Sequence, residues 1–113
     1  MSNETKTYIS ELLGPLKNLH KSSPDIMKGF STLHHQANEP GALDVITKEL
    51  LAITIGITTH CQDCIALHTK AFIDQGGTRE QLIETLNVCI YMGGGPSVMY
   101  AAKALKAFDD LTQ

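Results

Sequence analysis

The chain has 113 residues, which suits a single domain (residues 1–113) with one modest hydrophobic core. Hydrophobic residues make up 42% of it and charged residues 19%, an ordinary composition for a globular protein. The formal net charge is −3 and no run of Lys or Arg occurs. These features argue against a nucleic-acid or anionic-membrane partner, because both need a clustered basic face.

The ends and the apolar stretches give no sign of export or membrane insertion. The first ten residues, MSNETKTYIS, are polar and lack an apolar signal core. The longest apolar stretch, residues 50–57, is far shorter than a membrane span. We therefore expect a cytoplasmic protein. In a reducing cytosol, a C-x-x-C pair is more often catalytic or metal-binding than a structural disulfide.

The first third of the chain predicts two helices. Apolar side chains recur on one face of residues 4–20, and Pro15 is expected to kink or divide that helix. The tripeptide Ser-Pro-Asp at residues 23–25 has the pattern of a helix start, with a cap, a proline and an acidic residue. The breakers at residues 38–41 predict a loop after this second helix.

Residues 44–59 are ambiguous. The run ITIGITT is rich in β-branched residues, which favours a strand on propensity alone. We predict a buried helix instead, because the apolar segment is long for a strand and no second convincing strand could pair with it. Gly56 would then allow close packing between helices.

The remaining segments predict further helices. Residues 61–75 are amphipathic, and the glycines at 76–77 end them as a C-cap. Residues 78–81 fit a capping box that starts the next helix. The turn Gly-Gly-Gly-Pro at 93–96 precedes a last helix with apolar residues from Val98 to Phe108. The sequence thus predicts an all-α domain of about five or six helices, which we expect to assemble as a homo-oligomer.

The segment HCQDCIALH, residues 60–68, carries the chain's most distinctive chemistry. With Cys61 in the first turn of a helix, Cys64 lies roughly −60° and His68 roughly −20° from it around the axis. All three therefore share one face, and Cys64 and His68 are one turn apart. A helix N-terminus stabilises a thiolate, and two cysteines three apart can close a disulfide. This arrangement offers an attacking sulfur, a resolving sulfur and a base, as peroxide reduction or disulfide exchange requires.

A zinc site is the main alternative for the same residues. Cys61, Cys64 and His68 could supply three of the four ligands of a tetrahedral site. The fourth would be a carboxylate or one of three other histidines: His34, His35 and His60. Against this, the third cysteine, Cys89, stands alone and is predicted to belong to the core. Packing without chemistry is a further alternative.

Glu49 precedes an apolar run and has two interpretations. If the run is a buried helix, Glu49 lies near the interior, where a carboxylate withdrawn from water accepts a proton closer to neutral pH. It could equally be an exposed acid in the first helical turn, where it would favour the helix dipole.

Taken together, Glu49, Cys61, Cys64 and His68 resemble the E-x11-C-x-x-C-x3-H signature of the AhpD-like alkyl hydroperoxidases, a branch of the carboxymuconolactone decarboxylase family. The glycine turns at 76–78 and 93–96 also look like those of the family, and the likeness covers roughly residues 40–108.

The resemblance implies an all-helical fold that assembles into homotrimers or homohexamers. It implies peroxide reduction without a bound cofactor or metal, in which Cys64 attacks the hydroperoxide, Cys61 resolves the sulfenic acid, and Glu49 and His68 relay the proton. A dithiol such as a lipoyl group or a thioredoxin-like partner would then reduce the disulfide.

One position departs from the family pattern. The best-known peroxidase of this branch has a second histidine just before its second cysteine, where this chain has Asp63. A carboxylate there disfavours the neighbouring thiolate. It could weaken peroxidase activity or indicate disulfide exchange as the reaction. The decarboxylase branch, which is not marked by this cysteine pair, is a more distant alternative.

Overall fold

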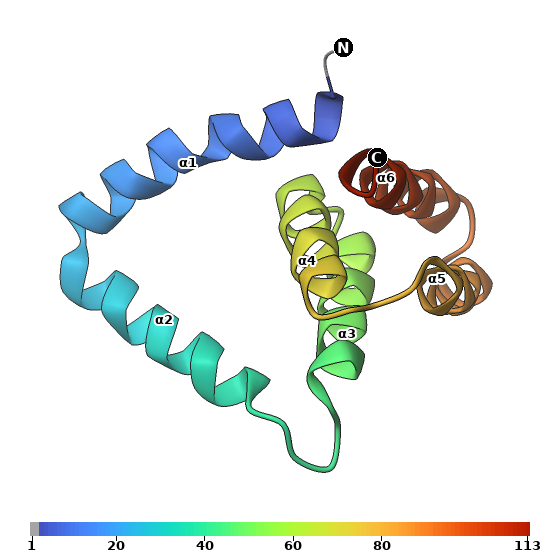
Figure 1. Cartoon of the computed structure of the whole chain (residues 1–113), viewed down its shortest axis with the longest axis horizontal. Coiled ribbons are helices and arrows are strands. Elements are labelled where there is room, and N and C mark those ends of the chain that lie inside the picture. Colours follow the sequence, from blue (N-terminus) through green and yellow to red (C-terminus); the bar gives the residue numbers. More distant parts are fainter. Residues whose placement is uncertain (1–2) are drawn as a thin grey trace.

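The computed structural model describes residues 3–113, and in this range the chain is all-α, as predicted (Figure 1). Six helices follow one another: α1 (Glu4–Ser22), α2 (Pro24–Asn38), α3 (Val45–Thr58), α4 (Gln62–Asp74), α5 (Arg79–Gly93) and α6 (Gly95–Leu111). No helix in residues 3–113 is long and apolar enough to cross a membrane.

Helices α3 to α6 form the packed body of the molecule. α4 packs against α3 and α6, and α5 packs against the same two helices. The largest fully buried side chains are Phe72, Ile53, Ile57, Ile65, Leu82 and Thr69. Cys89 belongs to the same core, as predicted. The cysteine segment is the start of α4 and therefore belongs to this body.

The ambiguous segment 44–59 is a helix, which confirms the prediction made from its length. Asp44 caps α3, with its Oδ1 accepting the backbone N–H of Thr47 at 2.8 Å. The hydroxyl of Thr54 donates to the carbonyl of Leu50 at 2.9 Å, one turn earlier. Burial of Ile53 and Ile57 therefore outweighs the strand propensity of this segment.

Gly56 brings α3 and α4 together, as predicted. A Cβ atom at this position would lie 3.3 Å from Cβ of Cys64 and 3.3 Å from Cγ1 of Ile65. A larger residue would push the first turn of α4 away from α3. The small residue on α3 thus determines how closely the cysteine segment approaches the body.

The connection between α4 and α5 is tight and well capped. Gly76 adopts a φ of 91°, which favours glycine, and Thr78 and Gln81 form the predicted capping box. Gly77 lies against the ring of Phe72, so that a Cβ atom there would come within 2.2 Å of the ring. The turn leaves no room for a side chain.

Helices α1 and α2 form a two-helix arm that extends away from the body (Figure 1). Its start is fastened to the end of α6, where the Thr5 hydroxyl donates to Oδ2 of Asp110 at 2.7 Å. This bond, followed by that from Lys106, lowers the pKa of Asp110. The contact is therefore present at neutral pH and weakens as acid protonates the carboxylate.

Two predictions about the arm are confirmed only in part. α1 continues through Pro15 to Ser22, so the proline does not divide it, although its ring nitrogen donates no hydrogen bond. Ser23 occupies the N-cap of α2, but its side chain makes no capping hydrogen bond. Pro24 in the first turn already fixes the backbone there, so the start of α2 needs no side-chain cap.

The apolar side of the arm is uncovered. No residue of α2 is buried, and Ile26 and Phe30 are 74% and 63% exposed. Leu13, Leu19 and Leu33 are also exposed. A monomeric globular protein rarely leaves so many large apolar side chains in water on two adjacent helices.

The closed turn at Gly77 predicts a marked loss of stability in Gly77→Ala. The added methyl group would overlap the buried Phe72 ring, so we expect the free energy of unfolding to fall by about 1–3 kcal/mol. Gly41→Ala is the control, because a Cβ atom at Gly41 meets nothing within 4 Å. Urea denaturation at fixed protein concentration would measure both. Equal stability of the two variants would contradict the packing described.

Candidate active site

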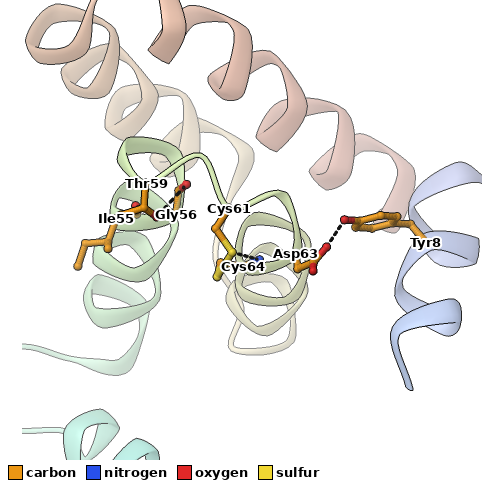
Figure 2. Close-up of a disulfide and its surroundings, with 7 residues drawn as sticks. All are labelled: Tyr8, Ile55, Gly56, Thr59, Cys61, Asp63 and Cys64. Atoms are coloured by element: carbon orange, nitrogen blue, oxygen red, sulfur yellow. Dashed lines mark hydrogen bonds between the residues drawn. A yellow bond between two sulfur atoms is a disulfide. The ribbon is translucent and has the colours of Figure 1, made fainter. Parts of the chain in front are cut away.

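Cys61 and Cys64 are joined by a disulfide at the start of α4 (Figure 2). Their Cα atoms are 5.3 Å apart. We predicted Cys61 in the first helical turn. It is instead the N-cap residue, and α4 begins one residue later than predicted, at Gln62. The Sγ atom of Cys61 accepts the backbone N–H of Cys64 at 3.2 Å. The sulfur thus takes the place of a capping oxygen, and the same N–H would stabilise a Cys61 thiolate.

The turn before the disulfide adopts an unusual backbone conformation. His60 has a φ of 58°, the left-handed region that non-glycine residues rarely adopt. Its ring stacks on Tyr100 of α6, with centroids 4.7 Å apart. The next N–H, that of Cys61, donates to the carbonyl of Gly56 at 2.8 Å. The stacking and this hydrogen bond together orient Cys61 toward the first turn of α4.

Glu49 and His68 form a hydrogen-bonded pair across the α3–α4 contact. Glu49 is 3% exposed, which resolves its two interpretations in favour of the buried one. The Nδ1–H of His68 donates to Oε1 of Glu49 at 3.0 Å. With Nδ1 held in this way, Nε2 of a neutral His68 is available to accept a proton. The pair is thus suited to move a proton one helical turn from Cys64.

A groove of about 740 Å³ opens between the arm and the body at this pair. Its polar lining includes Glu49, His68 and three further histidines: His20, His34 and His35. The ring of His34 lies 6.4 Å from that of His68, centroid to centroid. All three are exposed, and nothing in their spacing along the sequence indicated that the arm would bring them beside His68.

Asp63 points away from the sulfur atoms. Figure 2 shows its carboxylate directed toward α1, whereas the disulfide lies on the side of α4 that faces α3. The Tyr8 hydroxyl donates a hydrogen bond to Oδ1 of Asp63. This bond, then burial and the charge of the carboxylate, raise the pKa of Tyr8 above its usual value. Sequence analysis missed this contact because the two residues are 55 positions apart.

The zinc alternative needs at least three clustered ligands. Within residues 3–113, no group of three His, Cys, Asp or Glu side chains is placed to hold a metal ion. Both cysteines of the motif are instead bonded to each other. With the two sulfur atoms joined, neither is a thiolate that could bind a metal ion in this state.

The model of the carboxymuconolactone decarboxylase family matches residues 24–107 of the chain. This chain belongs to that family. The match begins at the first residue of α2 and ends near the end of α6, so it includes the whole cysteine segment and, of the arm, α2 alone. The family resemblance inferred from Glu49, Cys61, Cys64 and His68 is thereby confirmed at the level of the family.

Related proteins share the fold over nearly the full chain. A carboxymuconolactone decarboxylase family protein from Legionella pneumophila, solved in its apo form, is 40% identical with a TM-score of 0.95, covering 99% of this chain and 100% of its own. A family member from Thermotoga maritima, described as a candidate for the antioxidative response, is 25% identical with a TM-score of 0.78 over 90% of both chains. An uncharacterized protein of Cupriavidus necator is 38% identical over 98% of both chains.

The buried pair predicts a non-additive response to substitution. His68→Ala leaves the Glu49 carboxylate buried without its partner, so we expect a loss of about 2 kcal/mol in the free energy of unfolding. Adding Glu49→Gln removes the unpaired charge and should restore part of the loss, which urea denaturation would measure. His35→Ala, at an exposed position on the same groove, should change stability little. A double variant less stable than His68→Ala would contradict the pairing.

Proposed function

We propose that this protein is an AhpD-like thiol oxidoreductase of the cytoplasm, which reduces hydroperoxides through the Cys61–Cys64 pair. The observation that carries the proposal is the disulfide at a helix N-terminus, one helical turn from a histidine whose Nδ1 is held by a buried carboxylate. The relationship to a Thermotoga maritima protein described in terms of the antioxidative response also supports it.

The first step is attack by Cys64. Its thiolate attacks the terminal oxygen of the hydroperoxide, the O–O bond breaks, and Cys64 becomes a sulfenic acid while an alkoxide leaves. The alkoxide takes the proton that His68 removed from the Cys64 thiol, and Glu49 balances the charge of His68 while it holds that proton. Cys64 is assigned this role because it is four residues from His68 on the same helix, whereas Cys61 is two turns away.

The second step is resolution by Cys61. Its thiolate attacks the sulfur of the sulfenic acid, hydroxide leaves and is protonated to water, and the disulfide forms. Cys61 suits this role because its Sγ already accepts an N–H of the first turn, which stabilises the thiolate. A dithiol, such as a lipoyl group or a thioredoxin-like protein, then supplies two electrons and two protons to restore both thiols.

A second reaction uses the same atoms. In disulfide exchange, a protein or small-molecule disulfide takes the place of the hydroperoxide, and the attacking sulfur forms a mixed disulfide instead of a sulfenic acid. Asp63 favours this candidate, because it stands where the best-known peroxidase of the branch has a histidine, so that the chain departs there from the peroxidase pattern. Comparing how fast a hydroperoxide and a disulfide oxidise the Cys61–Cys64 pair distinguishes the two reactions.

Steady-state assays of the cysteine variants test the peroxidase. With an alkyl hydroperoxide and a dithiol reductant, wild-type protein should turn over, and both Cys64→Ser and Cys61→Ser should lose activity by at least about 100-fold. Only Cys61→Ser should form a sulfenic acid with one equivalent of peroxide, detectable by trapping with a 1,3-diketone. Cys89→Ser is the control and should keep activity, since Cys89 lies outside the site. Full peroxidase turnover by Cys64→Ser would contradict the mechanism.

We also propose that the protein is a homotrimer or homohexamer in which the arm packs on another copy. The exposed apolar side chains of the arm support this, as do exposed residues on α5 and α6, among them Tyr91, Met92 and Met99. A second copy presents both surfaces, so the arm of one copy can cover the exposed residues on α5 and α6 of the other. Association would also shield the groove that contains His68 from bulk water.

Sedimentation velocity tests the assembly. Wild-type protein should sediment with the mass of three or six chains of 12.3 kDa. Ile26→Glu combined with Phe30→Glu should shift it to smaller species without loss of helicity, because these side chains are exposed in the single chain. Lys28→Glu on the same helix serves as the control for added negative charge. A monomeric wild type, or an unchanged mass of the double variant, would contradict the proposal.

A further inference from the structure

Asp63 lies in the first turn of α4, directly before Cys64. A carboxylate there opposes a thiolate in two ways. Its negative charge repels that of the sulfur. It also competes with the sulfur for the backbone N–H groups at the N-terminus of α4, which form the positive end of the helix dipole. Any protein that uses these thiols as nucleophiles must therefore control where this carboxylate points.

The first helix of the arm provides that control. Tyr8 reaches α4 from α1 and donates its hydroxyl hydrogen to Oδ1 of Asp63, on the side of α4 turned away from the disulfide (Figure 2). The position of Tyr8 is itself determined, because Thr5 and Asn3, near the start of the same helix, are hydrogen-bonded to Asp110 of α6. Because the start of α1 is held to α6 in this way, the position of the Tyr8 hydroxyl beside Asp63 is fixed as well.

We infer that Tyr8 is a positioning residue for the redox pair. By holding the Asp63 carboxylate toward α1, it keeps the negative charge away from the sulfur atoms and the helix N-terminus free for a thiolate. Its substitution would allow Asp63 to turn back toward the first turn of α4. The inference rests on the proposed thiol chemistry, but it applies whether a hydroperoxide or a disulfide is the substrate.

Other charged groups surround this contact and also act on the thiols. The hollow that Tyr8 shares with α4 and α6 includes three charged side chains: Glu4 of α1, and Lys103 and Lys106 of α6. Glu11 lies beside Tyr8 on its outer side, and Glu49 and His68 act from the α3 side. Lys106 is engaged with Glu4 and Asp110. Tyr8 is nevertheless the residue hydrogen-bonded to Asp63.

Alkylation of the reduced motif measures the thiolate directly. Iodoacetamide modification of Cys61 and Cys64, followed by peptide mass mapping across a range of pH, reports their reactivity without any peroxide. We expect Tyr8→Phe to slow alkylation at neutral pH by about two-fold and to displace the profile to higher pH, while Asp63→Asn speeds it about two- to three-fold. Thr7→Val is the control, because it removes an exposed hydroxyl from the same helix, directly beside Tyr8.

A double variant separates this role from a general effect on the fold. In the Asp63→Asn background, Tyr8→Phe should have no further effect on alkylation, since no carboxylate remains to be positioned. The inference is overturned if Tyr8→Phe leaves the profile unchanged, or if it slows alkylation equally in both backgrounds. Absence of peroxide turnover would refute the proposed peroxidase but leave this measurement intact, so the two failures are distinguishable.

Discussion

The site depends on the close contact between α3 and α4. Gly56 allows the first turn of α4 to lie against α3, and this contact places Glu49 and His68 opposite each other. A buried carboxylate is costly unless it is paired, so the hydrogen bond from His68 is a condition of the packing as well as a feature of the chemistry. The same contact determines the position of Cys64, whose Cβ would meet any side chain added at residue 56.

The two cysteines occupy different environments within a single turn. Cys61 caps the helix and accepts a backbone N–H, whereas Cys64 lies within the first turn on the helix that carries His68. Such an asymmetry suits a reaction in which one sulfur attacks beside a proton donor and the other is held ready as a thiolate. The arm contributes to both sides of α4, through the groove histidines on one and Tyr8 on the other.

Most of the fold and the centre of the site could be predicted from the sequence. Periodicity and breakers indicated the helices, helical spacing placed Cys61, Cys64 and His68 on one face, and the family resemblance added Glu49 to them. Propensity alone would have made residues 44–59 a strand, and it was the length of the segment that indicated a helix. The burial of Glu49 could not be decided, because an acid in an early helical turn is compatible with either environment.

What the sequence could not predict are contacts between distant elements. Tyr8 and Asp63 are 55 positions apart, and the rings of His34 and His68 lie 6.4 Å apart across the groove between the arm and the body. The left-handed backbone of His60 also depends on a remote residue, Tyr100, which stacks on its ring. Nor does local sequence reveal that the apolar face of α2 stays uncovered within one chain, since its pattern is that of any amphipathic helix.

A thiol count after exposure to peroxide tests the central claim most directly. The protein is reduced, freed of reductant and metal, mixed with one equivalent of an alkyl hydroperoxide per chain, quenched, and titrated for free thiols under denaturing conditions beside a peroxide-free control. The account predicts a prompt fall from three thiols to one, with Cys89 the thiol that remains. Three thiols persisting in the peroxide-treated sample would contradict it and would direct attention to disulfide substrates.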